Sequence, residues 1–131
     1  MELKEYQVRA LTEVKACFEF LADWQKKSEQ IAEQIGEAGI DFPVKAWEKA
    51  GIVRSYMPRK NGIGEPLPNF CLKIPTGGGK TFLAVKMIDL VNMVYRKKKT
   101  GLVLWIVPTT QIYRQTIQSL KDRDQIGRAH V

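Results

Sequence analysis

Residues 72–85 read LKIPTGGGKTFLAV, and this stretch decides how the second half of the chain is interpreted. An apolar run precedes three consecutive glycines, and a second apolar run follows Lys80 and Thr81. Glycines let the backbone curve so that successive N–H groups converge on one point, and a helix that starts there adds the positive end of its dipole. The stretch therefore predicts a strand, a phosphate-binding loop and a helix, in that order.

The segments on either side of the loop continue this alternation. FCLKI (70–74) is typical of a short strand, and residues 81–95 have apolar positions nearly all round a helix. LVLWIV (102–107) is a continuous apolar run, as expected for a strand buried on both faces, and residues 108–120 begin another helix. Strand, helix, strand, helix requires a parallel, right-handed arrangement. We therefore expect an α/β fold, a partial P-loop domain with a parallel sheet built on a βαβα unit.

The first half of the chain is predicted to be helical. Apolar residues recur at helical spacing over 3–24, and a weaker stripe continues until Gly36. Asp41 can cap a short helix that Gly51 ends, and a loop rich in Pro and Gly follows over 55–69. We expect an N-terminal helical segment with its connector over 1–66 and the first part of the P-loop domain over 67–125.

Charge and composition narrow the class of protein. The chain of 131 residues has a net charge of +7, divided as −3 over residues 1–50 and +10 over 51–131. A basic half around a phosphate loop suits a protein that handles nucleotides or nucleic acid, although charge also serves solubility. No apolar run is long enough to cross a membrane, and the N-terminus lacks a signal core. Two distant cysteines indicate free thiols, so we expect a cytoplasmic protein.

The loop itself predicts an ATP and Mg²⁺ site. Lys80 would reach the outer phosphates as the catalytic lysine, and the Thr81 hydroxyl would ligate Mg²⁺. Ile74 occupies the position where the general P-loop pattern has its first glycine. A glycine-rich turn before a helix, without a ligand, is the alternative. The residues expected to hold the nucleotide phosphates are Thr76, Gly77, Gly78, Gly79, Lys80 and Thr81.

Three segments together resemble the superfamily-two helicases and translocases, the DEAD/DEAH-like proteins. IPTGGGKT (74–81) is similar to their motif I, and VPTTQIYRQT (107–116) is similar to motif Ia, which touches the nucleic-acid backbone. LKEYQVRAL (3–11) resembles their glutamine motif, which implies that Gln7 recognises the adenine edge. Taken alone, residues 108–116 are equally consistent with an ordinary connection between a strand and a helix. Taken alone, Gln7 is equally consistent with a surface glutamine on an amphipathic helix. The resemblance implies nucleic-acid contacts for Pro108, Thr109, Arg114 and Gln115.

Within this superfamily FCLKIPTGGGKTFLA (70–84), together with PLPN (66–69), looks most like the ATPase (Res) subunit of type III restriction endonucleases. That resemblance implies a RecA-like domain and a parent protein that hydrolyses ATP and moves along duplex DNA. It also implies a modification (methyltransferase) subunit as partner and an endonuclease function of the assembly. A small-molecule P-loop kinase and a non-catalytic nucleotide-binding module remain open as alternatives.

One motif of the superfamily is missing from the printed sequence. No apolar strand ending in Asp-Glu follows residue 116, and KDRDQ (121–125) is polar. Because phosphoryl transfer depends on such groups, we expect the chain to be an N-terminal fragment that binds nucleotide without turning it over. IGRAHV (126–131) matches what a common sequencing adapter encodes in one frame, so we interpret it as a non-native tail, with a natural C-terminus as the alternative.

Overall fold

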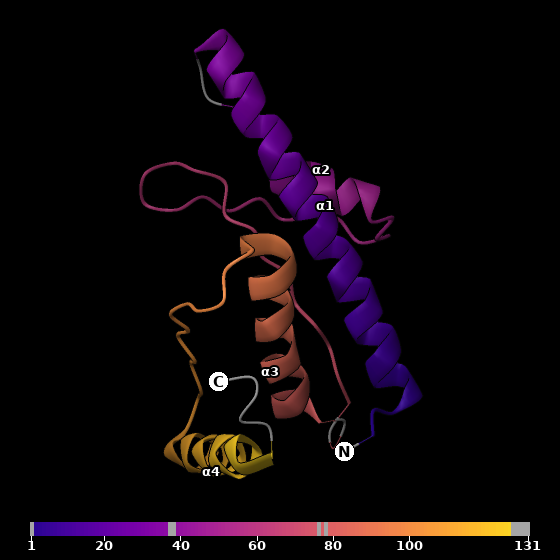
Figure 1. Cartoon of the computed structure of the whole chain (residues 1–131), viewed down its shortest axis with the longest axis vertical. Coiled ribbons are helices and arrows are strands. Elements are labelled where there is room, and N and C mark those ends of the chain that lie inside the picture. Colours follow the sequence, from indigo (N-terminus) through magenta and orange to yellow (C-terminus); the bar gives the residue numbers. More distant parts are fainter. Residues whose placement is uncertain (1, 37–38, 76, 78, 127–131) are drawn as a thin grey trace.

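A computed structural model describes residues 2–36, 39–75, 77 and 79–126, without the side chains of 123–126. Helix α1 runs along most of the long axis of the molecule, α2 lies beside its middle, and α3 lies beside its N-terminal half (Figure 1). α4 lies at the end of the long axis where α1 and α3 begin. The helices are α1 (Glu5–Ile35), α2 (Phe42–Lys49), α3 (Lys80–Leu90), its π-helical continuation η1 (Val91–Arg96) and α4 (Thr110–Ile126).

Helix α1 confirms the helical prediction for the first half of the chain. Its residues Val14, Phe18 and Leu21, one or two turns apart, are all buried. The helix ends at Gly36, whose φ of 68° lies in the left-handed region that a glycine adopts without strain. The weak stripe beyond residue 24 was therefore sufficient for a helix of 31 residues.

Helix α2 packs on α1 and completes the core. Asp41 Oδ1 accepts a hydrogen bond from the Val44 N–H at 3.5 Å, and Gly51 follows the helix with a φ of 70°. Both predicted caps are thus confirmed. The buried cluster consists of Val14, Phe18, Leu21, Phe42 and Ala46. Half-buried residues of α3 and η1 pack against it, among them Met87, Leu90, Val91, Val94 and Tyr95.

The predicted parallel sheet is wrong for the part of the chain that the structure describes. Residues 70–74 and 102–107 are extended but form no strand, and the one β-bridge joins Lys60 and Pro66 in the connector. Leu102, Leu104 and Ile106 are 100%, 83% and 82% exposed, although the apolar run predicted burial on both faces. The α/β fold and its βαβα unit are therefore replaced by a helical arrangement with two extended segments.

The physical reason is that a strand depends on a neighbour. An apolar run shows where side chains would be favourable, but ladder hydrogen bonds need a second backbone alongside. In Figure 1, residues 101–107 descend on one side of α3 and residues 70–75 on the other, so the two segments do not pair with each other.

Helix predictions in the second half hold. The predicted helix over 81–95 is α3 with η1, and that over 108–120 is α4. None of the described helices combines the length and hydropathy of a membrane span. Ile126 is the last residue of α4, whereas the rest of the proposed tail, Thr76 and Gly78 lie outside the described residues. The division at residue 66 stays a prediction.

Candidate nucleotide-binding site

The glycine-rich loop leads directly into α3. Gly77 and Gly79 have φ values of 77° and 78°, a backbone conformation that side-chain-bearing residues rarely adopt. Gly79 is the N-cap of α3, and its carbonyl accepts from the Leu83 N–H at 2.9 Å. The glycines at these two positions are therefore required by the path of the chain.

Gln7 reaches this loop from the first turn of α1. A Cβ atom added to Gly79 would lie 2.7 Å from Gln7 Nε2, so the side-chain amide is in close contact with the loop. The Gln7 side chain is buried at 7% exposure, and its Oε1 accepts from the Lys4 N–H at 3.0 Å. The structure thus brings together two segments that the sequence analysis had joined only through a resemblance.

The same contact places two helix N-termini next to each other. Gln7 lies in the first turn of α1, and Gly79 caps α3. Each helix start carries partial positive charge and N–H groups without helical partners, and both favour an anion. Lys80, the first residue of α3, is exposed, and Thr81 beside it is half-buried. The arrangement offers a cationic amine, a hydroxyl and helix dipoles at one end of the molecule.

The segment that resembles motif Ia starts α4. Thr109 Oγ1 accepts from the Ile112 N–H at 3.2 Å, so this hydroxyl caps the helix. Pro108, Arg114 and Gln115 are exposed. In Figure 1, α4 lies at the end of the molecule where α3 begins, so the candidate nucleic-acid residues are at the same end as the loop.

Comparison with known proteins decides the family. The family model described as "Type III restriction enzyme, res subunit" matches residues 1–129, which is nearly the whole chain. The chain belongs to this Res subunit family. A search of curated proteins and a search of solved structures each gave no match.

Membership in the Res family gives the loop its chemical context, because the family is one of helicase-like ATPases. It also argues against the small-molecule kinase. The donors fit a magnesium nucleotide: exposed Lys80 suits phosphate oxygens, and the Thr81 hydroxyl is a hard oxygen ligand of the kind that Mg²⁺ accepts. Among the described residues, no group of three or more His, Cys, Asp or Glu side chains could hold a metal ion by itself.

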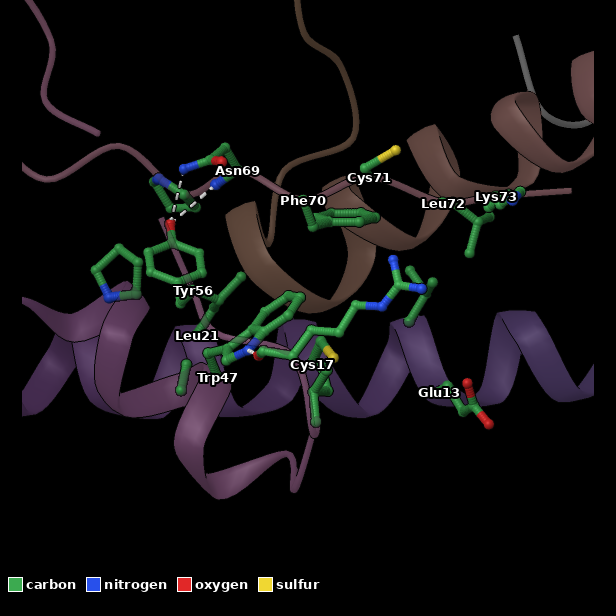
Figure 2. Close-up of a pocket in the computed structure, with 16 residues that line it drawn as sticks. Glu13, Cys17, Leu21, Trp47, Tyr56, Asn69, Phe70, Cys71, Leu72 and Lys73 are labelled. Atoms are coloured by element: carbon green, nitrogen blue, oxygen red, sulfur yellow. Dashed lines mark hydrogen bonds between the residues drawn. The ribbon is translucent and has the colours of Figure 1, made fainter. Parts of the chain in front are cut away.

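Sequence reading missed a cavity on the face of α1 that carries Val14 and Leu21. It has a volume of about 310 Å³ and lies between α1, α2 and the connector (Figure 2). Tyr56 Oη accepts from the Asn69 N–H at 3.2 Å and from Asn69 Nδ2 at 3.0 Å, so these bonds join the two ends of the connector beside the cavity. Burial raises the pKa of the Tyr56 hydroxyl. The signal available in the sequence was PLPN (66–69), which had been noted only for its resemblance to the family.

Proposed function

We propose that residues 74–81 bind the phosphates of ATP together with Mg²⁺. In this proposal the chain is the nucleotide-binding part of an ATP-dependent DNA helicase or translocase that serves as a subunit of a type III restriction enzyme. Membership in a family of helicase-like ATPases supports the general class. The observation that carries the specific proposal is the contact of Gln7 Nε2 with Gly79. It joins the start of α1 to the phosphate loop, in the way that a shared nucleotide site requires.

Each residue of the loop has a distinct task in this proposal. Lys80 neutralises the outer phosphates, while the dipole of α3 favours their charge. The Thr81 hydroxyl and the phosphate oxygens hold Mg²⁺, which supplies charge stabilisation for phosphoryl transfer when bound. Gln7 is assigned to the nucleotide site because its buried amide braces Gly79 and so preserves the curvature of the loop. Thr76 and Gly78 complete the proposed phosphate contacts.

Duplex DNA and a modification subunit are the proposed partners. For DNA, we assign backbone contacts to the start of α4, where Pro108 and Arg114 are exposed and the capping hydroxyl of Thr109 can still donate its own hydrogen. Gln115, also exposed, adds an amide donor on the same helix. Such contacts position a duplex without reading its sequence.

A titration with a fluorescent ATP analogue in the presence of Mg²⁺ tests the nucleotide site. Lys80→Ala is expected to weaken binding about 10- to 100-fold, because a charge-assisted hydrogen bond to phosphate is lost. Lys86→Ala is the matched control, since it removes the same charge from the same helix away from the loop. Equal affinity of the Lys80→Ala variant and the unmodified chain would refute the phosphate assignment.

Phosphate release by the same protein tests the second part of the proposal. We expect binding without turnover, because the printed sequence contains no strand ending in Asp-Glu that could order Mg²⁺ and the attacking water. Steady release of phosphate that disappears in Lys80→Ala would show that this chain has its own hydrolytic groups.

A further inference from the structure

A groove separate from the phosphate loop runs between α1 and α3. It has a volume of about 1230 Å³, and its third wall is the turn after η1 together with Val103. None of the loop residues that the structure describes, 74–75, 77 and 79–81, lines it. The walls of the groove therefore form a surface that is separate from the proposed nucleotide site.

Each helix contributes one continuous face to this groove. From α1 come Val8, Leu11, Thr12 and Lys15, and from α3 with η1 come Lys86, Asp89, Leu90 and Met93, with Ile88 and Asn92 at the edge of that second set. Both sets follow the spacing i, i+3, i+4, i+7, which places their members on one side of a helix. Val8 and Met93 are 48% and 68% exposed. Two helices with aligned faces and exposed apolar side chains form a seat that a third helix can fill.

The walls of the groove carry an excess of positive charge. Five lysines line it, and Asp89 is the single carboxylate among its described lining residues. The lysines are Lys15, Lys86, Lys97, Lys98 and Lys99. Lys97, Lys98 and Lys99 are exposed, and no carboxylate in the described part of the chain forms an ion pair with them.

The backbone of the lysine turn is held in place. Arg96 Nη1 donates to Asn92 Oδ1 at 2.8 Å and to the Thr100 carbonyl at 3.1 Å. The Lys98 N–H donates to the Asn92 carbonyl at 3.0 Å, and Lys97 adopts a φ of 53°. A turn fixed in this way presents its cations to a partner at a reduced entropic cost.

We propose that this groove binds an acidic amphipathic helix of a partner protein. The apolar residues along α1 and α3 would cover the apolar face of that helix, and the lysines would pair with carboxylates along its edges. A nucleic acid fits less well, because none of the described lining residues has an aromatic ring for bases to stack on and much of the wall is aliphatic. The site does not depend on nucleotide binding.

Fluorescence anisotropy of a labelled peptide tests the proposal. The probe has two heptads with leucine on one helical face and glutamate elsewhere, and its controls are a scrambled peptide of equal composition and a version with glutamine for glutamate. The first peptide is expected to bind about tenfold or more tightly than either control, because only it has both the apolar face and the charge. Equal binding of the scrambled peptide would overturn the proposal.

Two sets of variants separate the two contributions. Lys97→Ala/Lys98→Ala/Lys99→Ala is expected to weaken binding roughly tenfold, and Val8→Gln/Met93→Gln by about as much. Lys26→Ala/Lys49→Ala/Lys60→Ala removes the same charge from exposed positions outside the groove and should leave binding unchanged. All the changed side chains of the groove are exposed, and far-UV circular dichroism will verify that the helices persist.

Short duplex DNA serves as the competing probe. If DNA binds and is lost in the triple lysine variant of the groove while the Val8→Gln/Met93→Gln variant binds the peptide normally, the groove is a nucleic-acid site and the proposal fails. Lys80→Ala should leave peptide binding unchanged. An effect of Lys80→Ala on the peptide would show that the two sites are not separate and would overturn the proposed independence.

Discussion

The helical layer and the extended segment 102–107 have the same apolar character but differ in burial. In the layer formed by α1 and α2, Phe18 is 3% exposed and Ala46 is 2% exposed. In the segment 102–107, Leu104 is 83% exposed, and Leu102 is 100% exposed. Hydrophobicity alone therefore does not decide which of these segments is buried.

The difference lies in how each element satisfies its backbone. A helix forms its hydrogen bonds within one segment, so α1 needs only an apolar partner for one face. An extended segment must find a second backbone for its N–H and C=O groups, and neither 70–74 nor 102–107 pairs with a strand among the described residues. Stability is consequently concentrated in the helical layer, which leads to predictions that compare the two regions.

The largest effect is expected from truncation in the helical layer. Phe18→Ala removes a side chain at the centre of the buried cluster, where its ring also meets the Phe70 ring edge-on at a centroid distance of 5.7 Å. We expect a loss of about 3–5 kcal/mol in the free energy of unfolding. Urea unfolding followed by circular dichroism measures it.

Leu104→Ala is the matched change in the extended segment. Because this side chain is already exposed, the free energy of unfolding should change by no more than about 0.5 kcal/mol. A loss comparable to that of Phe18→Ala would mean that 102–107 is buried in solution, and the contrast drawn between the two regions would be wrong.

The junction between the extended segment 70–74 and α3 gives the next largest effect. Gly79→Ala adds the strain of a left-handed backbone, about 1–2 kcal/mol, and a Cβ atom that displaces Gln7. Gly51→Ala has a similar φ of 70° but no atom within 4 Å of the new Cβ, so it carries the strain alone. We expect nucleotide affinity to fall in the first variant and not in the second, as titration with the ATP analogue will show.

Gln7→Ala tests whether the glutamine braces the loop or reads the base. Loss of its hydrogen bond to the Lys4 N–H should cost about 1 kcal/mol of stability. If the amide acts through Gly79, the affinities for ATP and GTP should fall by the same factor. A fall for ATP alone would support the role in adenine recognition that the resemblance implied. The double variant Gln7→Ala/Gly79→Ala should lose less nucleotide affinity than the two single variants together, because each single change already removes the contact between Gln7 and Gly79.

Features that depend on interactions between residues close in sequence were predicted correctly, whereas features that depend on distant residues were not. The caps at Gly36, Asp41 and Gly51 were predicted correctly because each is governed by a few neighbouring residues. The spacing of Val14, Phe18 and Leu21 likewise identified the buried face of α1. Strand pairing depends on a distant backbone, and no pattern within LVLWIV could show that a partner was absent.

The candidate site follows the same rule. The loop was identified from its glycines together with Lys80 and Thr81, all within one short stretch. Gln7 was associated with it by resemblance, but its contact with Gly79 depends on how α1 packs beside α3. The groove was beyond prediction for a further reason. Its aligned faces come from separate helices, and the lysines of RKKK (96–99) lie beside those faces only in the folded chain.

The smallest predicted effect is a difference in thiol reactivity between the two cysteines, one of which lies in each of the two regions. Cys17 belongs to α1 and is half-buried, whereas Cys71 belongs to the extended segment and is exposed, although both line the cavity in Figure 2. Burial raises the pKa of the Cys17 thiol, and the charge of Glu13 raises it further. Because the thiolate is the reactive form, dithiodipyridine should modify Cys71 several-fold faster than Cys17 at mildly alkaline pH.

Variants with a single cysteine will show which rate belongs to Cys17 and which to Cys71. The raised pKa of Cys17 also predicts how the free energy of unfolding changes with pH. Since the folded chain retains the Cys17 proton to a higher pH than the unfolded chain, its contribution to stability is complete below the ordinary thiol pKa and is lost as pH rises above it. Cys17→Ser should flatten that alkaline loss, and Glu13→Gln should speed the reaction of Cys17 by lowering its pKa. Equal rates for the two thiols would mean that α1 opens at Cys17 as readily as the extended segment exposes Cys71, and the helical layer would then not be the more stable region.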